Sequence, residues 1–444
     1  MGDPASAENA VLSAENAALR AEIAALRDEL KRRERSCHPT HVCTGDPFLR
    51  LDPLECTKLS NDEIRRYSRQ LIMSEIGPER QRLLRSKSVL IVGAGGLCST
   101  SAMYLSGAGI GRIGVVDFDR VEISNLQRQI IHKESDEGEL KSISASRSIR
   151  EFNSDTRVVA YPVMLMPENA LEIIRPYDLV LDCTDNVSSR YLINDACVML
   201  DKPLVSGSAL RMEGHVTVYH YGEMGPCYRC LFPDPPPRDA QGNCNNEGVL
   251  GVVPGIIGCI QALEAIKVLI CGQTLSGRML YLDANTSVFR EFKLRARNSN
   301  CSVCGDRPRI TKLFNYESCS PSPILPGNAS IVPDSQKITA RDYFFQVLEK
   351  KQKHLLLDVR PSVQFNICSL PQSVNAPLSE LDDVIQRLDP PVVPSSPIYV
   401  ICRRGKDSQL AVKKLVDLGF YNAKSIIGGV SAWSREVDSD FPTY

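Results

Sequence analysis

Residues 89–129 read VLIVGAGGLCSTSAMYLSGAGIGRIGVVDFDRVEISNLQRQ, and this stretch decides the fold. The apolar run at 89–92 predicts a buried parallel strand, and a glycine-rich turn, GAGG at 93–96, leads from it into an uncharged helical stretch. A second strand ends at Asp117 and Asp119. Such a turn presents backbone N–H groups to phosphates, and an acidic residue after the second strand is placed to bind a ribose hydroxyl. The stretch predicts a nucleotide-binding α/β fold.

Two details of this stretch qualify the nucleotide signal. Cys98 stands where the third glycine of a dinucleotide fingerprint is expected, so the glycine turn by itself is weak evidence. The segment SNLQRQ at 124–129 sharpens it, because a dinucleotide fold needs neither Asn125 nor Arg128 there. A guanidinium group matches phosphate geometry, so Arg128 suits a triphosphate.

Composition sets the class of protein. The 444 residues are 43% hydrophobic and 24% charged, which predicts a soluble globular protein of two or three domains. The net charge of −1 argues against direct nucleic-acid binding. The uncharged stretch enclosed by Lys87 and Arg112 contains six glycines, which favours strand, loop and helix over a membrane span. No basic-then-apolar signal pattern begins the sequence, so we expect a cytoplasmic (cytosolic) protein without membrane association. Its 16 cysteines indicate metal or thiol chemistry.

The chain is expected to have four parts. Residues 1–57 contain a helix at 7–35 and a linker; leucines recur in this helix every seven residues, as in a short coiled coil or an amphipathic helix lying on its own domain. Within residues 58–317, strand-like and helical runs alternate from Lys87 to about Leu294, which predicts a doubly wound, mostly parallel α/β domain. The Pro/Ser-rich segment 318–335 is a predicted linker, and 336–444 a smaller α/β domain.

A capping box starts the second part. Ser60 and Glu63 have the spacing with which each side chain satisfies a backbone N–H of the other residue. We expect them to begin one helix that runs through IRRYSRQLI, residues 64–72.

Asp185 and Asn186 follow the apolar run YDLVLDCT, at the carboxyl end of a predicted strand. Open α/β sheets bind their ligands at that edge, and a carboxylate there can hold Mg²⁺ on triphosphate oxygens. The alternative is that the pair only caps the following helix, which is the commoner role of an isolated dipeptide. By themselves, Arg69 and Lys141 are ordinary surface cations.

Two CxxC pairs are the strongest metal signal. Cys227 with Cys230 and Cys301 with Cys304 match a structural zinc site of four thiolates. Because the pairs are far apart in the sequence, the metal would join the end of the α/β domain to its middle. Redox-active pairs are the alternative, but the flanking glycines and prolines favour the metal.

Two single cysteines are candidate nucleophiles. Cys244 lies in the polar loop QGNCNNEG, where an accessible thiol is plausible, although a free cysteine is usually buried and inert. Cys402 ends the apolar run IYVI and precedes Arg403, Arg404 and Lys406 and then a helix. These cations and the helix N-terminus favour a thiolate or persulfide anion.

Together these motifs resemble the ubiquitin-activating-enzyme superfamily, and most closely its two-domain eukaryotic adenylyltransferases and sulfurtransferases. The resemblance runs from about residue 60 to Tyr444, and RYSRQ, GAGGL, VDFD, SNLQRQ, DN and the paired CxxC motifs follow in family order. Residues 336–444 resemble a rhodanese domain through LLDVRP, with Asp358 and Arg360, and through the Cys402 loop. Asp407 stands where many rhodaneses have a basic residue; its charge disfavours small anions such as thiosulfate, so a protein persulfide donor fits better.

The resemblance implies a role for each site residue. Cys227, Cys230, Cys301 and Cys304 would bind Zn²⁺, Cys244 matches the crossover-loop cysteine, and Cys402 matches the persulfide-bearing cysteine. Arg69 matches an arginine that such enzymes insert from the other subunit of a homodimer. ATP and its Mg²⁺ would be held, in addition, by Gly96, Asp117, Ser124, Asn125, Leu126, Gln127, Arg128, Lys141, Asp185 and Asn186.

The implied function is ATP-dependent adenylation of the C-terminal glycine of a ubiquitin-fold sulfur carrier, then sulfur transfer from a Cys402 persulfide to give a thiocarboxylate. The carriers would be the small subunit of molybdopterin synthase and the ubiquitin-related modifier, serving molybdenum cofactor synthesis and tRNA wobble-uridine thiolation, with a cysteine desulfurase as sulfur donor. Three alternatives remain open: a modifier activator that uses a Cys244 thioester without sulfur transfer, a nucleotide-dependent oxidoreductase, and a non-catalytic adaptor.

Overall fold

The protein divides into two compact units, Met1–Ser322 and Pro323–Tyr444. The structure is a computed structural model that describes residues 51–236, 248–316, 331–388, 391 and 393–444. The predicted helix at 7–35, Cys244 and residues 318–330 of the predicted linker lie outside the described residues. The division between the units falls within the segment predicted as a linker, and each unit is described by itself.

An eight-stranded sheet forms the centre of the larger unit, in the order β3-β2-β1-β4-β5-β6-β7-β8. The strands from β3 to β5 pair in parallel, and β6, β7 and β8 continue the sheet antiparallel. Their bounds in chain order are β1 Ser88–Val92, β2 Arg112–Val116, β3 Arg157–Tyr161, β4 Leu179–Asp182, β5 Leu204–Leu210, β6 Glu213–Tyr219, β7 Arg278–Asp283 and β8 Val288–Lys293.

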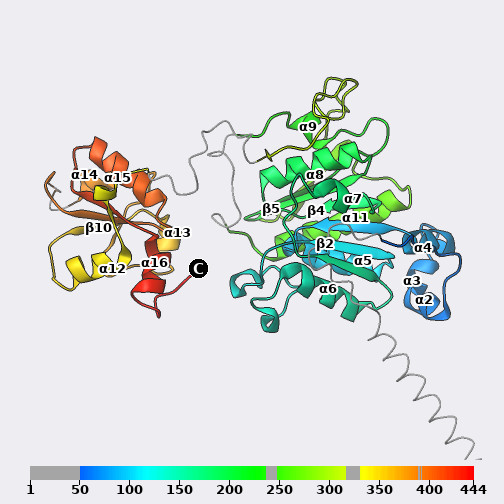
Figure 1. Cartoon of the computed structure of the whole chain (residues 1–444), viewed down its shortest axis with the longest axis horizontal. Coiled ribbons are helices and arrows are strands. Elements are labelled where there is room, and N and C mark those ends of the chain that lie inside the picture. The colour runs from blue at the N-terminus through cyan, green and yellow to red at the C-terminus, as the bar shows by residue number, and fades with distance from the viewer. Residues whose placement is uncertain (1–50, 237–247, 317–330, 389–390, 392) are drawn as a thin grey trace, which may run out of the picture. The chain divides into compact units, whose positions relative to one another are not determined.

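Helices cover both faces of the parallel half of this sheet (Figure 1). Strand β1 shows why, because its side chains alternate between two cores: Val89 and Ile91 pack with α5, α6 and α11, whereas Leu90 and Val92 pack with α7 and α8. The helix bounds are α2 Asn61–Arg66, α3 Ser68–Leu71, α4 Gly77–Arg85, α5 Gly96–Gly107, α6 Lys141–Phe152, α7 Ala170–Ile174, α8 Val187–Met199, α9 Tyr228–Leu231 and α11 Val252–Leu269.

The strand register brings four strand ends to one edge of the sheet. Val92 pairs with Val116 and with Asp182, and Val116 pairs with Tyr161 at the end of β3. The connection after β1 leads to β2 on one side of β1, whereas β4 lies on the other side. Because the strand order reverses at β1, a crevice opens at the carboxyl ends of β1 and β4. Whatever follows β1, β2 and β4 therefore lies around one crevice.

The helix expected from Ser60 through residue 72 is broken in the structure. The predicted capping box is present: Ser60 Oγ accepts from the Glu63 N–H at 3.1 Å, and a Glu63 carboxylate oxygen accepts from the Ser60 N–H at 2.7 Å. The helix ends at Tyr67, whose side chain is 1% exposed and whose hydroxyl accepts a hydrogen bond from Asn153 Nδ2 at 3.1 Å. Burial of Tyr67 fixes a non-helical backbone there, and the single predicted helix becomes α2 and α3.

Helix α11 is, among the described residues, the one helix long and apolar enough to cross a membrane, with a mean hydropathy of 1.7. It packs instead along α5 in the core, where Val253, Ile257 and Ala265 are buried. Its composition fits a core helix of an α/β domain.

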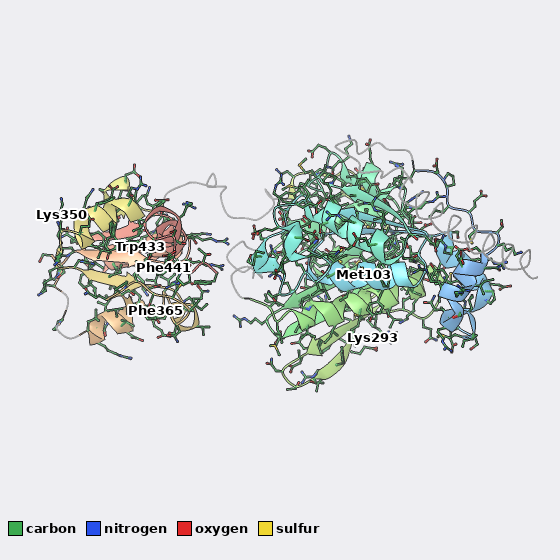
Figure 2. The ribbon with its side chains drawn as sticks, turned by 90° about the horizontal axis from the view of Figure 1, so that it is seen from below. Met103, Lys293, Lys350, Phe365, Trp433 and Phe441 are labelled. Carbon is green, nitrogen blue, oxygen red and sulfur yellow. The ribbon has the colours of Figure 1, made fainter. Side chains whose placement is uncertain are left out.

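The smaller unit has a five-stranded parallel sheet in the order β11-β10-β12-β13-β9. Trp433 lies in the core on one face of this sheet, and Phe441 packs against that core (Figure 2). Together, the two sheets confirm the predicted fold class. The bounds are β9 Lys337–Ile338, α12 Ala340–Tyr343, a π-helical turn Phe344–Leu348, β10 Leu355–Asp358, α13 Ser362–Phe365, β11 Val374–Asn375, α14 Leu381–Arg387, β12 Ile398–Ile401, α15 Asp407–Asp417, β13 Ala423–Ile426 and α16 Gly429–Glu436.

Candidate functional site: a nucleotide cavity, a four-cysteine cluster and a buried thiol

A cavity of about 270 Å³ lies at the aligned strand ends of the larger unit. It is bordered by the residues that follow β1, β2 and β4 and by the later part of β5. Of the predicted ATP-binding residues, those on its wall are Gly96, Asp117, Arg128, Lys141, Asp185 and Asn186. Ser124, Asn125, Leu126, Gln127 and Arg69 are not among the described lining residues.

The glycine turn is shaped by close packing. Gly93 has a φ of +94°, and a Cβ there would lie 2.7 Å from the carbonyl oxygen of Cys183. A Cβ on Gly96 would lie 3.1 Å from Pro254 and 3.2 Å from the carbonyl oxygen of Arg128. No side chain caps α5, which begins at Gly96, so its first backbone N–H groups are available to a ligand. Cys98 is fully buried in the core and is not part of the cavity wall.

Asp117 directly follows β2 and borders the cavity. Its carboxylate accepts from the Ala94 N–H at 2.7 Å and from the Asp119 N–H at 2.8 Å. Burial raises the pKa of Asp117, while the hydrogen bond from Ala94 and the charge of Lys141 oppose that shift. The carboxylate is thus fixed by backbone donors at the place where the sequence predicts a ribose contact.

The SNLQR segment contributes Arg128 to the cavity and uses other residues to hold it. Arg128 Nη2 donates to Asn125 Oδ1 at 3.0 Å, and Nη1 donates to the Ser124 carbonyl oxygen at 3.3 Å. Ser124 and Asn125 belong to a 3-10 turn, Ile123–Asn125, and Asn125 is buried. These contacts fix the position of the guanidinium on the cavity wall.

Lys141 is the first residue of α6 and borders the cavity although its side chain is 9% exposed. Its Nζ lies 3.0 Å from a carboxylate oxygen of Asp119, the second acidic residue after β2. This ion pair holds the ammonium group beside Asp117 on the nucleotide side of the cavity.

Asp185 and Asn186 lie in the short connection between β4 and α8. Asn186 is the N-cap of α8, and its Oδ1 accepts from the Ser189 N–H at 2.8 Å, so the capping alternative holds for this residue. Asp185 is exposed and borders the cavity. Its carboxylate is the kind of oxygen ligand that binds Mg²⁺ together with phosphate oxygens.

Arg69 is exposed on the four-residue helix α3. Its position outside the cavity wall is compatible with the predicted role on a partner subunit, where it would act away from its own nucleotide site.

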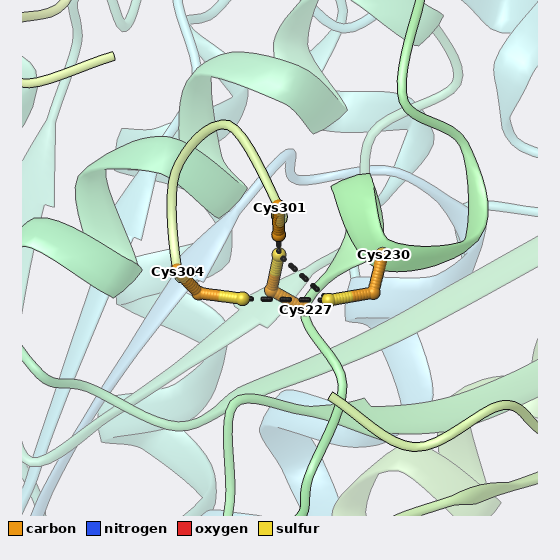
Figure 3. Close-up of side chains that lie close together, drawn as sticks. All are labelled: Cys227, Cys230, Cys301 and Cys304. Atoms are coloured by element: carbon orange, nitrogen blue, oxygen red, sulfur yellow. Dashed lines mark hydrogen bonds between the residues drawn. The ribbon is translucent and has the colours of Figure 1, made fainter. Parts of the chain in front are cut away.

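The four paired cysteines form a buried cluster (Figure 3). The Sγ–Sγ distances are 3.8 Å between Cys227 and Cys230, 3.6 Å between Cys227 and Cys301, and 3.4 Å between Cys230 and Cys304. Four thiolates about 2.3 Å from one zinc ion would lie about 3.8 Å apart in a regular tetrahedron. The donor set and its size therefore fit Zn²⁺, with each thiolate as one ligand.

Two loops far apart in the sequence supply these cysteines. Cys227 is the N-cap of α9 and Cys230 lies within it, whereas Cys301 and Cys304 lie in a turn closed by the Gly305 N–H, which donates to the Cys301 carbonyl oxygen at 3.1 Å. The N–H of Asn298 donates to Cys230 Sγ at 3.4 Å. A backbone donor to sulfur stabilises a thiolate ligand.

Cys402 follows β12 in the smaller unit and is 1% exposed. Its Sγ accepts from the Gly405 N–H at 3.0 Å and donates to Ser408 Oγ at 3.4 Å. Gly405 has a φ of +84°, and a Cβ there would lie 2.5 Å from the backbone nitrogen of Gly428. Residues 402–408 thus form a tight loop around the sulfur, and Asp407 is exposed in the first turn of α15.

The motif with Asp358 and Arg360 supports this loop from the neighbouring strand. Arg360 is 2% exposed and its Nε lies 2.9 Å from Asp358 Oδ1. Arg360 also donates to the hydroxyl of Tyr444 at 2.7 Å, and the ring of Tyr444 lies 4.8 Å from the guanidinium carbon of Arg403. Arg403, the residue after Cys402, thus contacts the ring of Tyr444, and the buried ion pair holds that ring through the hydrogen bond from Arg360.

Sequence reasoning missed Arg190, which borders the same cavity with a side chain that is 14% exposed. Its spacing was the available signal: it follows the helix cap Asn186 by four residues, which puts both on one face of α8. It also missed the wall formed by Ser208, Ala209 and Leu210 on β5.

Comparisons with known proteins show which families the sequence matches. The family model described as "ThiF family" matches residues 67–303, and the "Rhodanese-like domain" model matches residues 342–436. The chain is 47% identical over 399 residues to the adenylyltransferase and sulfurtransferase MOCS3 of Aedes aegypti, covering 87% of this chain and 90% of that protein. It is 50% identical over 397 residues to MOCS3-1 of Zea mays, covering 87% and 84%. A solved structure of E. coli MccB with AMPCPP and MccA has 21% identity and a TM-score of 0.49, and covers 56% of this chain and 75% of that chain.

Proposed function

The chain belongs to the ThiF family and is an adenylyltransferase and sulfurtransferase, and we propose that it adenylates the C-terminal glycine of a ubiquitin-fold sulfur carrier and converts it to a thiocarboxylate. The observation that carries the proposal is the cavity in which Asp117, Arg128, Lys141 and Asp185 come together at aligned strand ends. We further propose that the carriers are the small subunit of molybdopterin synthase and the ubiquitin-related modifier, for molybdenum cofactor synthesis and tRNA wobble-uridine thiolation in the cytosol.

Adenylation needs a ribose contact and a way to offset phosphate charge. Asp117 accepts hydrogen bonds from the ribose, while Arg128 and Lys141 bind the phosphates and favour a negatively charged transition state. Asp185 would hold Mg²⁺, which would supply positive charge to phosphate oxygens. Arg69 is proposed to contribute from the partner subunit of a homodimer.

In the first step a carboxylate oxygen of the carrier forms a bond to the α-phosphorus of ATP. The bond from that phosphorus to the bridging oxygen breaks, and pyrophosphate leaves with the electron pair. The acyl carbon of the acyl-adenylate now bears AMP, a good leaving group, in place of the carboxylate oxygen, which is a poor one. The four cysteines would hold a zinc ion in a structural role, because four thiolates leave no open coordination position.

In the second step the terminal sulfur of a Cys402 persulfide attacks the acyl carbon and AMP leaves. A cysteine desulfurase is the proposed source of that sulfur, because Asp407 beside the loop disfavours a small free anion. The resulting acyl disulfide releases the thiocarboxylate when a second thiol attacks Cys402 Sγ and forms a disulfide with it. Cys244 is the proposed second thiol, either in this role or through a carrier thioester formed before sulfur transfer.

ATP–pyrophosphate exchange tests the adenylation step. The full chain is expected to catalyse exchange with either carrier and not with a carrier that lacks its final glycine. Asp185→Asn keeps the shape of the side chain but weakens the Mg²⁺ ligand, so exchange should fall roughly 10²–10³-fold, as when one electrostatic contact is removed. The matched control, Asp201→Asn, changes an exposed carboxylate outside the cavity wall and should leave exchange unchanged. Near-normal exchange in Asp185→Asn would remove Asp185 from the site.

A further inference from the structure

Arg190 borders the nucleotide cavity and has no part in the steps above. Among the described residues that form the cavity wall, it and Arg128 are the two arginines. Arg190 lies in the first half of α8, directly after the connection that carries Asp185. Burying most of a charged side chain costs free energy unless the charge is paired, so the contacts of this guanidinium are informative.

The protein pairs one side of this guanidinium. Arg190 Nη2 donates to the carbonyl oxygen of Thr184 at 3.3 Å and to that of Gly207 at 3.2 Å, and Nε lies 3.7 Å from a carboxylate oxygen of Asp182. Asp182 is 1% exposed and accepts from Ser206 Oγ at 2.8 Å. Arg190 therefore connects Thr184, which follows the end of β4, to Gly207 in the middle of β5, and these contacts fix its position before any ligand arrives.

The other side of the guanidinium is left for a ligand. Within the part of the chain that the structure describes, Nη1 of Arg190 makes no hydrogen bond, and Nε is the buried nitrogen of this side chain without a hydrogen-bond partner. Nη1 is therefore accessible, and Arg190 is part of the cavity wall. Its two N–H groups match an anionic oxygen acceptor.

The order of the strands indicates which reactant lies there. Asp117 follows β2, the glycine turn follows β1, Asp185 follows β4, and the β5 wall at 208–210 comes next along the edge. A nucleotide with its ribose at Asp117 and its phosphates near Asp185 leaves the β5 end of the cavity for the second reactant. Arg190 contacts the β5 carbonyl of Gly207 and so lies at that end.

We propose that Arg190 binds the C-terminal carboxylate of the carrier and orients it for attack on the α-phosphorus of ATP. This assignment rests on the proposed function. One carboxylate oxygen forms the new bond to phosphorus while Nη1 donates to the other oxygen. The guanidinium remains charged throughout, so it holds the acyl group during the departure of pyrophosphate. Arg190 is in this account a substrate-binding catalytic residue, and its chemical target is a terminal carboxylate.

Binding measurements separate this role from a structural one. The full chain is saturated with α,β-methylene-ATP and Mg²⁺, which prevents adenylation, and titrated calorimetrically with the small subunit of molybdopterin synthase. The carrier is used in two forms, with its natural C-terminal carboxylate and with a C-terminal carboxamide. The test variant is Asp182→Asn combined with Arg190→Gln, which removes both buried charges together and leaves neither unpaired. Asp182→Asn alone, which keeps the guanidinium, is the matched control.

The control is expected to bind the carboxylate form about 10-fold or more tightly than the carboxamide, as one charge-assisted hydrogen bond provides. The double variant should bind the two forms equally, and its affinity for α,β-methylene-ATP should equal that of the control. A double variant that still prefers the carboxylate, or that loses nucleotide affinity by the same factor as carrier affinity, overturns the assignment. If the unchanged chain binds neither form and shows no pyrophosphate exchange, the proposed function itself fails.

Discussion

At the residue scale, Asp117 is a carboxylate of the cavity wall whose pKa is shifted by its surroundings. Burial raises its pKa, while the N–H of Ala94 and the ammonium of Lys141 favour the carboxylate. A ribose hydroxyl would donate to the charged carboxylate, and protonation replaces this charged acceptor by a neutral and weaker one. Because the pKa is raised, protonation begins at a higher pH than for an ordinary aspartate, and ATP binding should weaken as the pH falls through that raised pKa.

This pH dependence can be measured directly. The dissociation constant of α,β-methylene-ATP with Mg²⁺ is expected to rise from neutral to moderately acid pH more steeply for the unchanged chain than for Asp117→Asn. The nucleotide phosphates titrate equally in both titrations, so the difference between the two curves reports Asp117. Parallel curves would show that this carboxylate does not contact the nucleotide.

The sequence could predict the cavity residues that follow strands, because a polar residue after an apolar run marks a strand end. Asp117 and Asp185 were predicted in this way, and both border the cavity. Arg190 was missed because only its four-residue spacing from Asn186 marks it in the sequence, and its direction depends on the carbonyl oxygens of Thr184 and Gly207. Motif spacing also does not reveal that Arg128 borders the cavity whereas Asn125 is buried behind it. The 3-10 turn that contains Asn125 determines this difference.

At the scale of elements, alternation of apolar runs was sufficient to predict the parallel half of the larger sheet. Strand β1 is buried on both faces, which a run of four apolar residues already implies. The break between α2 and α3 was not predictable, because local signals favour one helix and the burial of Tyr67 against the body of the unit overrides them. Local pattern determines where such a helix starts, and tertiary packing determines where it ends.

The stability of the larger unit should depend on the two loops that carry the four clustered cysteines. Cys227→Ser removes one ligand and leaves three thiols crowded in a buried cluster. Metal analysis should find about one zinc ion per unchanged chain and near none in the variant, together with a lower melting temperature. Adenylation should fall only as far as the protein unfolds, since no open coordination position is available for chemistry.

Cys271→Ser provides the control for this experiment, because Cys271 is exposed and outside the cluster. It should keep its zinc and its melting temperature. Absence of zinc from the unchanged chain, purified without chelator, would refute the metal assignment.

At the scale of the whole molecule, the groups for each half-reaction lie within one unit. The nucleotide cavity is built from Met1–Ser322, and the loop that surrounds Cys402 from Pro323–Tyr444. The sequence predicted both α/β sheets, since strand–helix alternation repeats on either side of a Pro/Ser-rich segment. The predicted helix at 7–35 and the role of Cys244 remain predictions, because both lie outside the described residues.

The central claim is that one chain first adenylates a carrier and then transfers sulfur to it from Cys402. The most direct measurement compares the unchanged chain with Cys402→Ala, each incubated with ATP, Mg²⁺, carrier, a cysteine desulfurase and its cysteine substrate. ATP–pyrophosphate exchange and the mass of the carrier are followed in the same samples. The account predicts that Cys402→Ala retains exchange and forms no thiocarboxylate, while the unchanged chain carries an added sulfur on Cys402. Thiocarboxylate formation by Cys402→Ala, or an added sulfur on Cys244 and none on Cys402, would contradict it.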